Sequence, residues 1–325
     1  MKKYKICKIL LVILAIFLCV AFYELLGICV AYKKQPEVSN TTKKETKNGS
    51  WNECSENTER AVIIEKNPEA LLQRVRLIKN AKKEIILSTF AFQSDESGKL
   101  ILGALHDAAD RGVHIRLLVD GMESWIDMEG NPYFYGLSSH ENVEIKLYNK
   151  ANPLKPWKIM GRMHDKYLIA DGKRYILGGR NTYNYFLGDF PGHKNYDRDV
   201  LVVCDEPEKE NSVNQLLEYF ETIWEQEDSG YFHDNKKLAN RKSVKNAVLE
   251  LQNGYQKYFE ENKERICDTD YTDETFETEK IALVSNPIHT GSKEPVVWYQ
   301  LGELMKNAKN RVKIHTPYII CNDMM

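Results

Sequence analysis

Residues 9–32 form an uninterrupted apolar stretch in which Glu24 is the single charged residue. At about 1.5 Å per residue, a helix over these 24 residues is long enough to cross the ~30 Å hydrocarbon layer of a bilayer. A polar segment without apolar periodicity follows it. The sequence therefore predicts a signal-anchor or transmembrane segment over residues 1–34 and a polar linker over residues 35–60.

The residues that flank the apolar stretch bear on its orientation. Lysines precede it at positions 2, 3, 5 and 8, which places the N-terminus in the cytoplasm by the positive-inside rule. The remainder of a single-pass chain is then expected outside the cytoplasm, although Lys33 and Lys34 weaken this asymmetry. A cleaved signal peptide is the alternative, but Cys29-Val30-Ala31 matches the small-residue cleavage pattern poorly.

The overall composition is that of a globular chain. Apolar residues make up 42% of the 325 residues and charged residues 28%. A net charge of −2 argues against a general nucleic-acid coat protein, which needs a basic excess. Nucleic acid is therefore not favoured as a partner. Seven cysteines without a CxxC pair give no support for a disulfide scaffold or a zinc ribbon.

Strand-like and helix-like patterns alternate from about residue 61 onward. Strands are predicted at residues 62–64, 84–92, 114–120, 143–148, 167–170, 175–177 and 200–203. Helices are predicted from residue 67, over 99–111 and 212–225, and through the charged region 236–265. This order predicts an α/β fold, with a mostly parallel or mixed sheet that is flanked by helices on both faces.

The opening pattern of the globular part returns near the end of the sequence. Lys-Asn-Ala-Lys at residues 79–82 is followed by EIILSTFAF, and the same four residues at 306–309 are followed by RVKIHTPYI. A predicted strand and helix precede each copy, with the second strand at residues 281–284. We interpret this as a duplication. It predicts a first lobe over residues 61–270 and the incomplete start of a second lobe over residues 271–325.

Basic residues are concentrated between residues 146 and 180. This window holds nine lysines and arginines and two acidic residues. A local excess of positive charge in a chain that is nearly neutral overall indicates an anionic ligand. A solvated basic loop is the alternative reading of the charge alone.

One motif within this window favours a site. His164 and Lys166 are two residues apart, so in an extended strand they point to the same face. A lysine neutralises phosphate oxygens, and an adjacent histidine offers a nucleophile or a proton donor. Gly178 and Gly179 allow close approach of the backbone to a ligand, and Asn181 can donate from its amide.

The order of these residues resembles the HxKxxxxD…GxN signature of the phospholipase D superfamily. The stretch GRMHDKYLIADGKRYILGGRNTYNYF and the later YDRDV are similar to bacterial phospholipase D-type cardiolipin synthases. The resemblance implies that His164 is the nucleophile and forms a phosphohistidine. It also implies that Lys166, Asn181 and Gly179 bind the substrate phosphate.

The resemblance assigns two further carboxylates. Asp171 completes the catalytic signature and is expected to secure the local fold rather than to contact substrate. Asp197 is expected to orient the histidine, with Asp199 as the alternative. The chemistry of the family needs neither a metal nor another cofactor, and none is expected here.

The resemblance also implies a second histidine, from the second lobe. With the observed offset, the second signature would fall beyond Met325. The chain is therefore expected to be incomplete, and to need the second lobe in cis or a second chain to complete the active site.

The expected function is that of a membrane-anchored phosphatidyl transferase of the cardiolipin synthase type, acting on an anionic, phosphatidylglycerol-like phospholipid. Two alternatives stay open. One is a phospholipase D-type hydrolase or a phosphodiesterase/nuclease, because water and alcohol acceptors share the first step. The other is an inactive, membrane-tethered lobe that binds anions or a partner. Trp157, beside Lys155 and Lys158, either packs its loop or rests at a lipid interface.

Overall fold

The computed structural model describes residues 2–33, 36–49, 59–204, 206, 211–233 and 235–314. Of the predicted returning strand RVKIHTPYI, residues 311–314 have no regular structure. The remainder of that strand lies outside the described residues.

One mixed sheet forms the centre of the globular part. Within the described residues its nine strands follow the spatial order β8-β4-β3-β2-β5-β6-β7-β1-β9. The strands are β1 (Glu59–Ile64), β2 (Glu84–Thr89), β3 (His114–Asp120), β4 (Val143–Tyr148), β5 (Tyr167–Ala170), β6 (Arg174–Gly178), β7 (Asp199–Cys204), β8 (Ser229–Tyr231) and β9 (Phe276–Glu277).

The mixed α/β sheet is confirmed, but its parallel part is smaller than the alternating pattern predicts. Parallel pairing joins β2 to β3 and β3 to β4. The other neighbouring strands are antiparallel. For β5 and β6 the reason is their short connection, which turns the chain back directly and leaves no room for a crossover helix.

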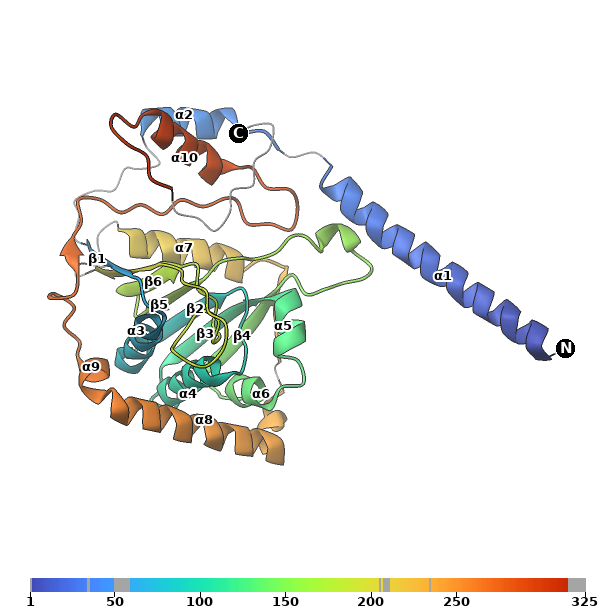
Figure 1. The fold of residues 1–325 in the computed structure, drawn as a ribbon, viewed down its shortest axis with the longest axis horizontal. Coiled ribbons are helices and arrows are strands. Elements are labelled where there is room, and N and C mark those ends of the chain that lie inside the picture. The colour runs from blue at the N-terminus through green and yellow to red at the C-terminus, as the bar shows by residue number, and fades with distance from the viewer. Residues whose placement is uncertain are drawn as a thin grey trace.

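Helices cover both faces of the sheet, as predicted (Figure 1). One face carries α3 (Asn67–Asn80), α4 (Glu96–Asp110), α6 (Pro132–Ser138) and α8 (Lys242–Glu261), and the other carries α7 (Ser212–Trp224). The side chains of β2 point alternately to the two faces of the sheet and so contribute to both hydrophobic cores. Ile85 and Leu87 pack with the α3 and α4 side chains, whereas Ile86 packs with those of α7. The predicted helical region 236–265 is divided into η3 (Lys236–Asn240), α8 and α9 (Lys263–Cys267).

The N-terminal helix α1 (Lys2–Ala31) extends away from the globular part (Figure 1). From Tyr4 to Ala31 it is long and apolar enough to cross a membrane, and its apolar side chains are exposed. This agrees with the predicted apolar segment.

The predicted linker contains a helix, α2 (Asn40–Asn48). The Ser39 hydroxyl accepts a hydrogen bond from the Thr42 amide at its start, and Gly49 ends it with φ 74°. These cap signals are local, and the apolar-periodicity test does not register them. Glu294 accepts hydrogen bonds from the Ser39 amide and the Thr42 hydroxyl, which joins α2 to the segment before α10 (Val296–Lys306).

The predicted strand at residues 281–284 is wrong, because these residues have no regular structure. The Leu283 amide donates to the Gln215 side chain of α7 at 2.8 Å. Ile281 and Leu283 also pack against the core beneath α7. The Gln215 side chain therefore accepts the hydrogen bond that a neighbouring strand would otherwise accept.

A buried carboxylate joins three elements behind one end of the sheet. Asp199 Oδ2, at the start of β7, lies 2.9 Å from an Arg74 nitrogen of α3 and 3.2 Å from an Arg180 nitrogen. All three side chains are at least 95% buried. Arg180 also donates to the carbonyl oxygens of Ile64 and Glu65. The network fixes the ends of β1, β6 and β7 relative to one another.

We expect Asp199→Asn to lower the free energy of unfolding by about 3–5 kcal/mol, because it leaves two buried guanidinium groups without their shared counter-charge. Urea unfolding in detergent at pH 7 measures the loss. The matched control is Glu65→Gln, whose pair with Arg198 has side chains 57% and 49% exposed. That control should cost about 0.5 kcal/mol or less. Equal losses for the two variants would contradict the structural importance of the network.

Candidate active site

The candidate site lies at one end of the sheet, where five strands bring their termini together. β2, β3 and β6 end there, and β5 and β7 begin there, because β5 and β7 run antiparallel to their neighbours. Segments that are distant in the sequence thus meet in a single region: residues 90–91, Asp120, 162–166, 178–181 and 197–199.

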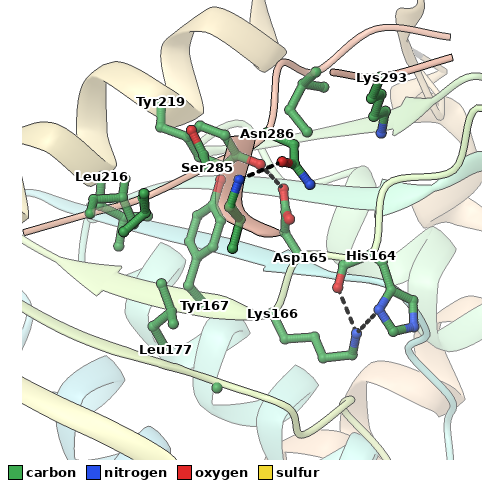
Figure 2. A pocket seen from close by; sticks show the side chains of 15 residues that line it. His164, Asp165, Lys166, Tyr167, Leu177, Leu216, Tyr219, Ser285, Asn286 and Lys293 are labelled. Atoms are coloured by element: carbon green, nitrogen blue, oxygen red, sulfur yellow. Dashed lines mark hydrogen bonds between the residues drawn. The ribbon is translucent and has the colours of Figure 1, made fainter. Parts of the chain in front are cut away.

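His164 and Lys166 lie just before β5 and contact each other, as the sequence predicts (Figure 2). Lys166 Nζ lies 3.1 Å from His164 Nδ1 and donates to the His164 carbonyl oxygen at 2.6 Å. Lys166 is 6% exposed, whereas His164 is exposed at the surface. The hydrogen bond from the Gly178 amide to the Lys166 carbonyl oxygen fixes this segment against β6.

Burial and neighbouring charge set the protonation of this pair. Desolvation lowers the pKa of His164, and the adjacent charge of Lys166 lowers it further. The Phe90 ring, 4.5 Å from the imidazole between centroids, excludes water from one side of it. Desolvation also lowers the pKa of Lys166 to about 8, against the opposing effect of Asp165 and Asp197. Near pH 7 the site therefore presents a neutral imidazole beside an ammonium group.

Asp120, the last residue of β3, joins the segment before His164 through Arg162 and the Met163 amide, a connection that no sequence pattern identifies. The Arg162 guanidinium donates to both Asp120 carboxylate oxygens at 2.7–3.0 Å and to Glu123 at 2.9 Å. It also lies over the Phe90 ring, 4.9 Å from its centroid. Asp120 is 1% exposed. An acidic residue that ends a buried strand was the available signal.

The paired glycines lie against two carboxylates. A Cβ at Gly178 would lie 2.0 Å from Asp199 Oδ1, and a Cβ at Gly179 would lie 2.0 Å from Asp197 Oδ2. Asn181, which is 7% exposed, accepts a hydrogen bond from the Ala91 amide through Oδ1. Its side-chain amide nitrogen is thereby directed away from that backbone group.

The structure separates Asp171 and Asp197 from the imidazole. Asp171 lies at the opposite end of β5 and accepts hydrogen bonds from the amides of Lys82, Lys83 and Glu84. This arrangement secures the turn before β2. The Asp197 carboxylate accepts from the Arg198 amide. Within the described residues no hydrogen bond joins Asp197 to His164, and its effect at the site is to raise the pKa of Lys166.

Asp165 points to the opposite side of the segment, into a cavity of about 350 Å³ (Figure 2). The Tyr219 hydroxyl of α7 donates to Asp165 Oδ2 at 2.7 Å. Burial raises the pKa of Asp165 and lowers that of Lys293, which lines the same cavity. His164 and Lys166 also line it. The period-two rule, which places His164 and Lys166 on one face, was the signal that Asp165 faces the other.

Within the part of the chain that the structure describes, no group of three or more His, Cys, Asp or Glu side chains is arranged to hold an ion.

One known protein family matches the segment that carries the candidate site. Residues 74–224 match the family model described as "Cardiolipin synthase, PLD-like domain". This segment is similar to the phospholipase D-like domain that the family model describes. The matched segment includes His164, Lys166, Asp171, Asn181 and Asp197.

The curated relatives that this chain matches are longer than the chain itself. An uncharacterized protein of Helicobacter pylori strain J99 is 30% identical over 212 residues, which cover 61% of this chain and 39% of that protein. Cardiolipin synthase C of Escherichia coli is 29% identical over 171 residues, which cover 48% and 34%. The chain thus spans between about a third and two fifths of these relatives. Among solved structures, the phospholipase D family member Nuc from Salmonella typhimurium has a TM-score of 0.39 at 19% identity, covering 54% of this chain and 99% of that one.

We expect Lys166→Met to stabilise the fold at pH 7 by about 1–3 kcal/mol, at about 1.4 kcal/mol per pKa unit with allowance for residual solvation. The folded-state pKa of about 8 lies below the ordinary lysine value of 10.5, so the unfolded chain binds the proton more tightly. Stability should therefore rise with pH from about 8 to about 10.5 in the original chain, and this part of the rise should disappear in the variant. Urea unfolding in detergent across this range measures it.

The matched control is Lys99→Met, because the partners Glu250 and Tyr133 raise the pKa of Lys99. This variant should give no gain in stability at pH 7. A Lys166→Met profile that coincides with that of the original chain would contradict the burial of an unfavourable charge at the site.

Proposed function

We propose that this chain is a membrane-anchored phosphatidyl transferase of the cardiolipin synthase type. It would move a phosphatidyl group from one phospholipid to the hydroxyl group of another. The observation that carries the proposal is the 3.1 Å contact between Lys166 Nζ and His164 Nδ1 at the open end of the sheet. The match to the cardiolipin synthase domain model supports a phospholipid, of the anionic phosphatidylglycerol kind, as the substrate.

The first step uses the neutral imidazole. The unprotonated ring nitrogen of His164 attacks phosphorus, an N–P bond forms, and the P–O bond to the glycerol that leaves is broken. The Lys166 ammonium transfers its hydrogen bonds from the imidazole to the non-bridging oxygens and stabilises their charge. Asn181 supplies an amide donor to the same oxygens. The product is a phosphatidyl-histidine adduct and an alkoxide that needs a proton.

A second acid-base group completes the reaction. It protonates the alkoxide as it leaves, then accepts the proton of the incoming hydroxyl group, whose oxygen forms the new P–O bond while the N–P bond breaks. The 325-residue sequence holds one HxKxxxxD motif. We propose that a second histidine, from a second lobe in cis or from a second chain, supplies this group. In this account residues 61–270 are the first lobe and residues 271–325 begin the second.

Helix α1 supports the membrane part of the proposal. Its apolar side chains are exposed from Ile6 to Val30, and a bilayer would cover them. With residues 1–34 as a single-pass anchor, the lysines before the apolar stretch favour an extracytoplasmic position for the first lobe. The lobe is then held at the surface where its substrate resides.

We expect His164→Asn to lower the formation of cardiolipin from phosphatidylglycerol vesicles by at least about 1,000-fold, because the nucleophile is lost. Thin-layer chromatography of the lipids measures it. The matched control is His114→Asn, at the far end of β3, where His114 pairs with Glu84 and Glu144. That variant should retain activity within about twofold.

Two outcomes would contradict the proposal in different ways. Phosphatidic acid without cardiolipin would replace the transferase by a hydrolase, since water would then be the acceptor. Turnover that His164→Asn leaves unchanged would exclude His164 as the nucleophile.

A further inference from the structure

Residues 150–161 form a loop that stands out from the lobe immediately before the catalytic segment. The Asn149 side chain joins the two ends of the loop by donating to the carbonyl oxygens of Lys158 at 2.7 Å and Gly161 at 2.9 Å. Asn149 itself has φ 52°, in the left-handed region. The short helix η2 (Pro156–Lys158) lies at the outer part of this loop and reaches toward α1 (Figure 1).

The loop exposes large apolar side chains among lysines. Leu154 is 76% exposed, Met160 58% and Trp157 44%. The charged residues of the loop are Lys150, Lys155 and Lys158, and none of its residues is acidic. An aqueous surface does not stabilise such a set. Apolar side chains with tryptophan and lysine are the composition of a segment at the boundary between headgroups and acyl chains.

The loop also lies directly beside the last turns of α1. The Tyr23 hydroxyl donates to the Leu154 carbonyl oxygen at 3.0 Å. A Cβ at Gly27 would lie 2.5 Å from Pro156 Cγ, so glycine permits the close approach. At about 1.5 Å per residue, Tyr23 is about 12 Å along the helix from Ala31. If α1 spans the bilayer, Leu154 therefore lies at the depth of Tyr23, which is inside the membrane relative to the point where α1 leaves it.

We propose that residues 150–161 insert into the headgroup and acyl-chain boundary of the bilayer beside α1, as a second membrane contact that positions the active site. The inference rests on the proposed function in one respect, that α1 is the anchor. The apolar side chains enter the boundary and the lysines contact anionic headgroups. His164 follows Met160 by four residues, so this insertion holds the nucleophile near the level of lipid phosphates.

The exposed face of α5 (Gly121–Asp127) extends the same surface. Trp125 is 69% exposed and Ile126 66%. α5 lies on the side of the lobe that faces α1 (Figure 1). The ion pairs from Arg162 to Asp120 and Glu123 hold the first turn of α5 beside the end of the loop. The end of the loop and α5 are thereby joined.

The test places an environment-sensitive fluorophore on the loop of the full-length chain. The native cysteines other than the buried Cys204 are replaced by serine, and Leu154→Cys is labelled with nitrobenzoxadiazole. The matched control is Leu249→Cys on α8, where leucine is 56% exposed on the far side of the lobe. Vesicles of phosphatidylcholine and phosphatidylglycerol provide the membrane, and brominated lipids provide the quencher.

We expect at least a threefold rise in emission at position 154, which brominated lipid quenches, and no change at position 249. If the chain floats with the vesicles but the fluorophore at position 154 keeps the emission it has in water, the inference is wrong. The proposal that α1 anchors the chain in the membrane is then still supported. If the chain does not float, the anchor fails and the inference fails with it. Emission that rises without lipid quenching would assign the loop to a protein interface and would equally overturn the proposal.

A second variant gives a functional readout. Leu154→Asp with Met160→Asp should lower turnover of vesicle phosphatidylglycerol at least tenfold, while turnover of a short-chain, monomeric phosphatidylglycerol stays within twofold. The control Leu249→Asp should change neither. Equal losses on both substrates would show a defect in the site itself and would contradict a membrane contact.

Discussion

The end of the sheet that carries the candidate site is organised around one buried carboxylate. Asp199 is held between Arg74 and Arg180, and its oxygens also approach Gly178 so closely that a side chain there would overlap them. Burial of three charged groups is costly unless each is paired, so the arrangement tolerates little displacement. The ends of β1, β6 and β7 are therefore fixed, and through the hydrogen bond between Gly178 and Lys166 the segment with His164 is fixed as well.

Local rules predicted the central part of the site. Strand periodicity placed His164 and Lys166 on one face, and the structure brings them into contact. The same rules could not identify the pair of Asp120 and Arg162, because it depends on the register of β3 against a loop 42 residues further along the chain. They also assigned a strand to residues 281–284, and this was wrong. Apolar residues form a strand only where a neighbouring strand accepts the hydrogen bonds. The Gln215 side chain takes that part instead.

The protonation of the site and its position relative to the membrane have a common physical basis. Desolvation lowers the pKa of both His164 and Lys166, so a neutral imidazole lies beside an ammonium group. In the proposed account the loop over residues 150–161 brings this pair to the lipid surface. A negatively charged headgroup then replaces the lost hydration of Lys166, which links substrate binding to the cost of burying the lysine.

The most direct test of the central claim is to trap the phosphatidyl group on His164. A phosphatidyl ester of p-nitrophenol suits this purpose, because p-nitrophenolate leaves without a proton and the first step then needs no second histidine. The account predicts a burst of p-nitrophenolate equal to the amount of protein. It also predicts, by mass spectrometry of the quenched protein, a phosphatidyl adduct on the peptide that contains His164. A burst without this adduct, or an adduct on another residue, would contradict the account.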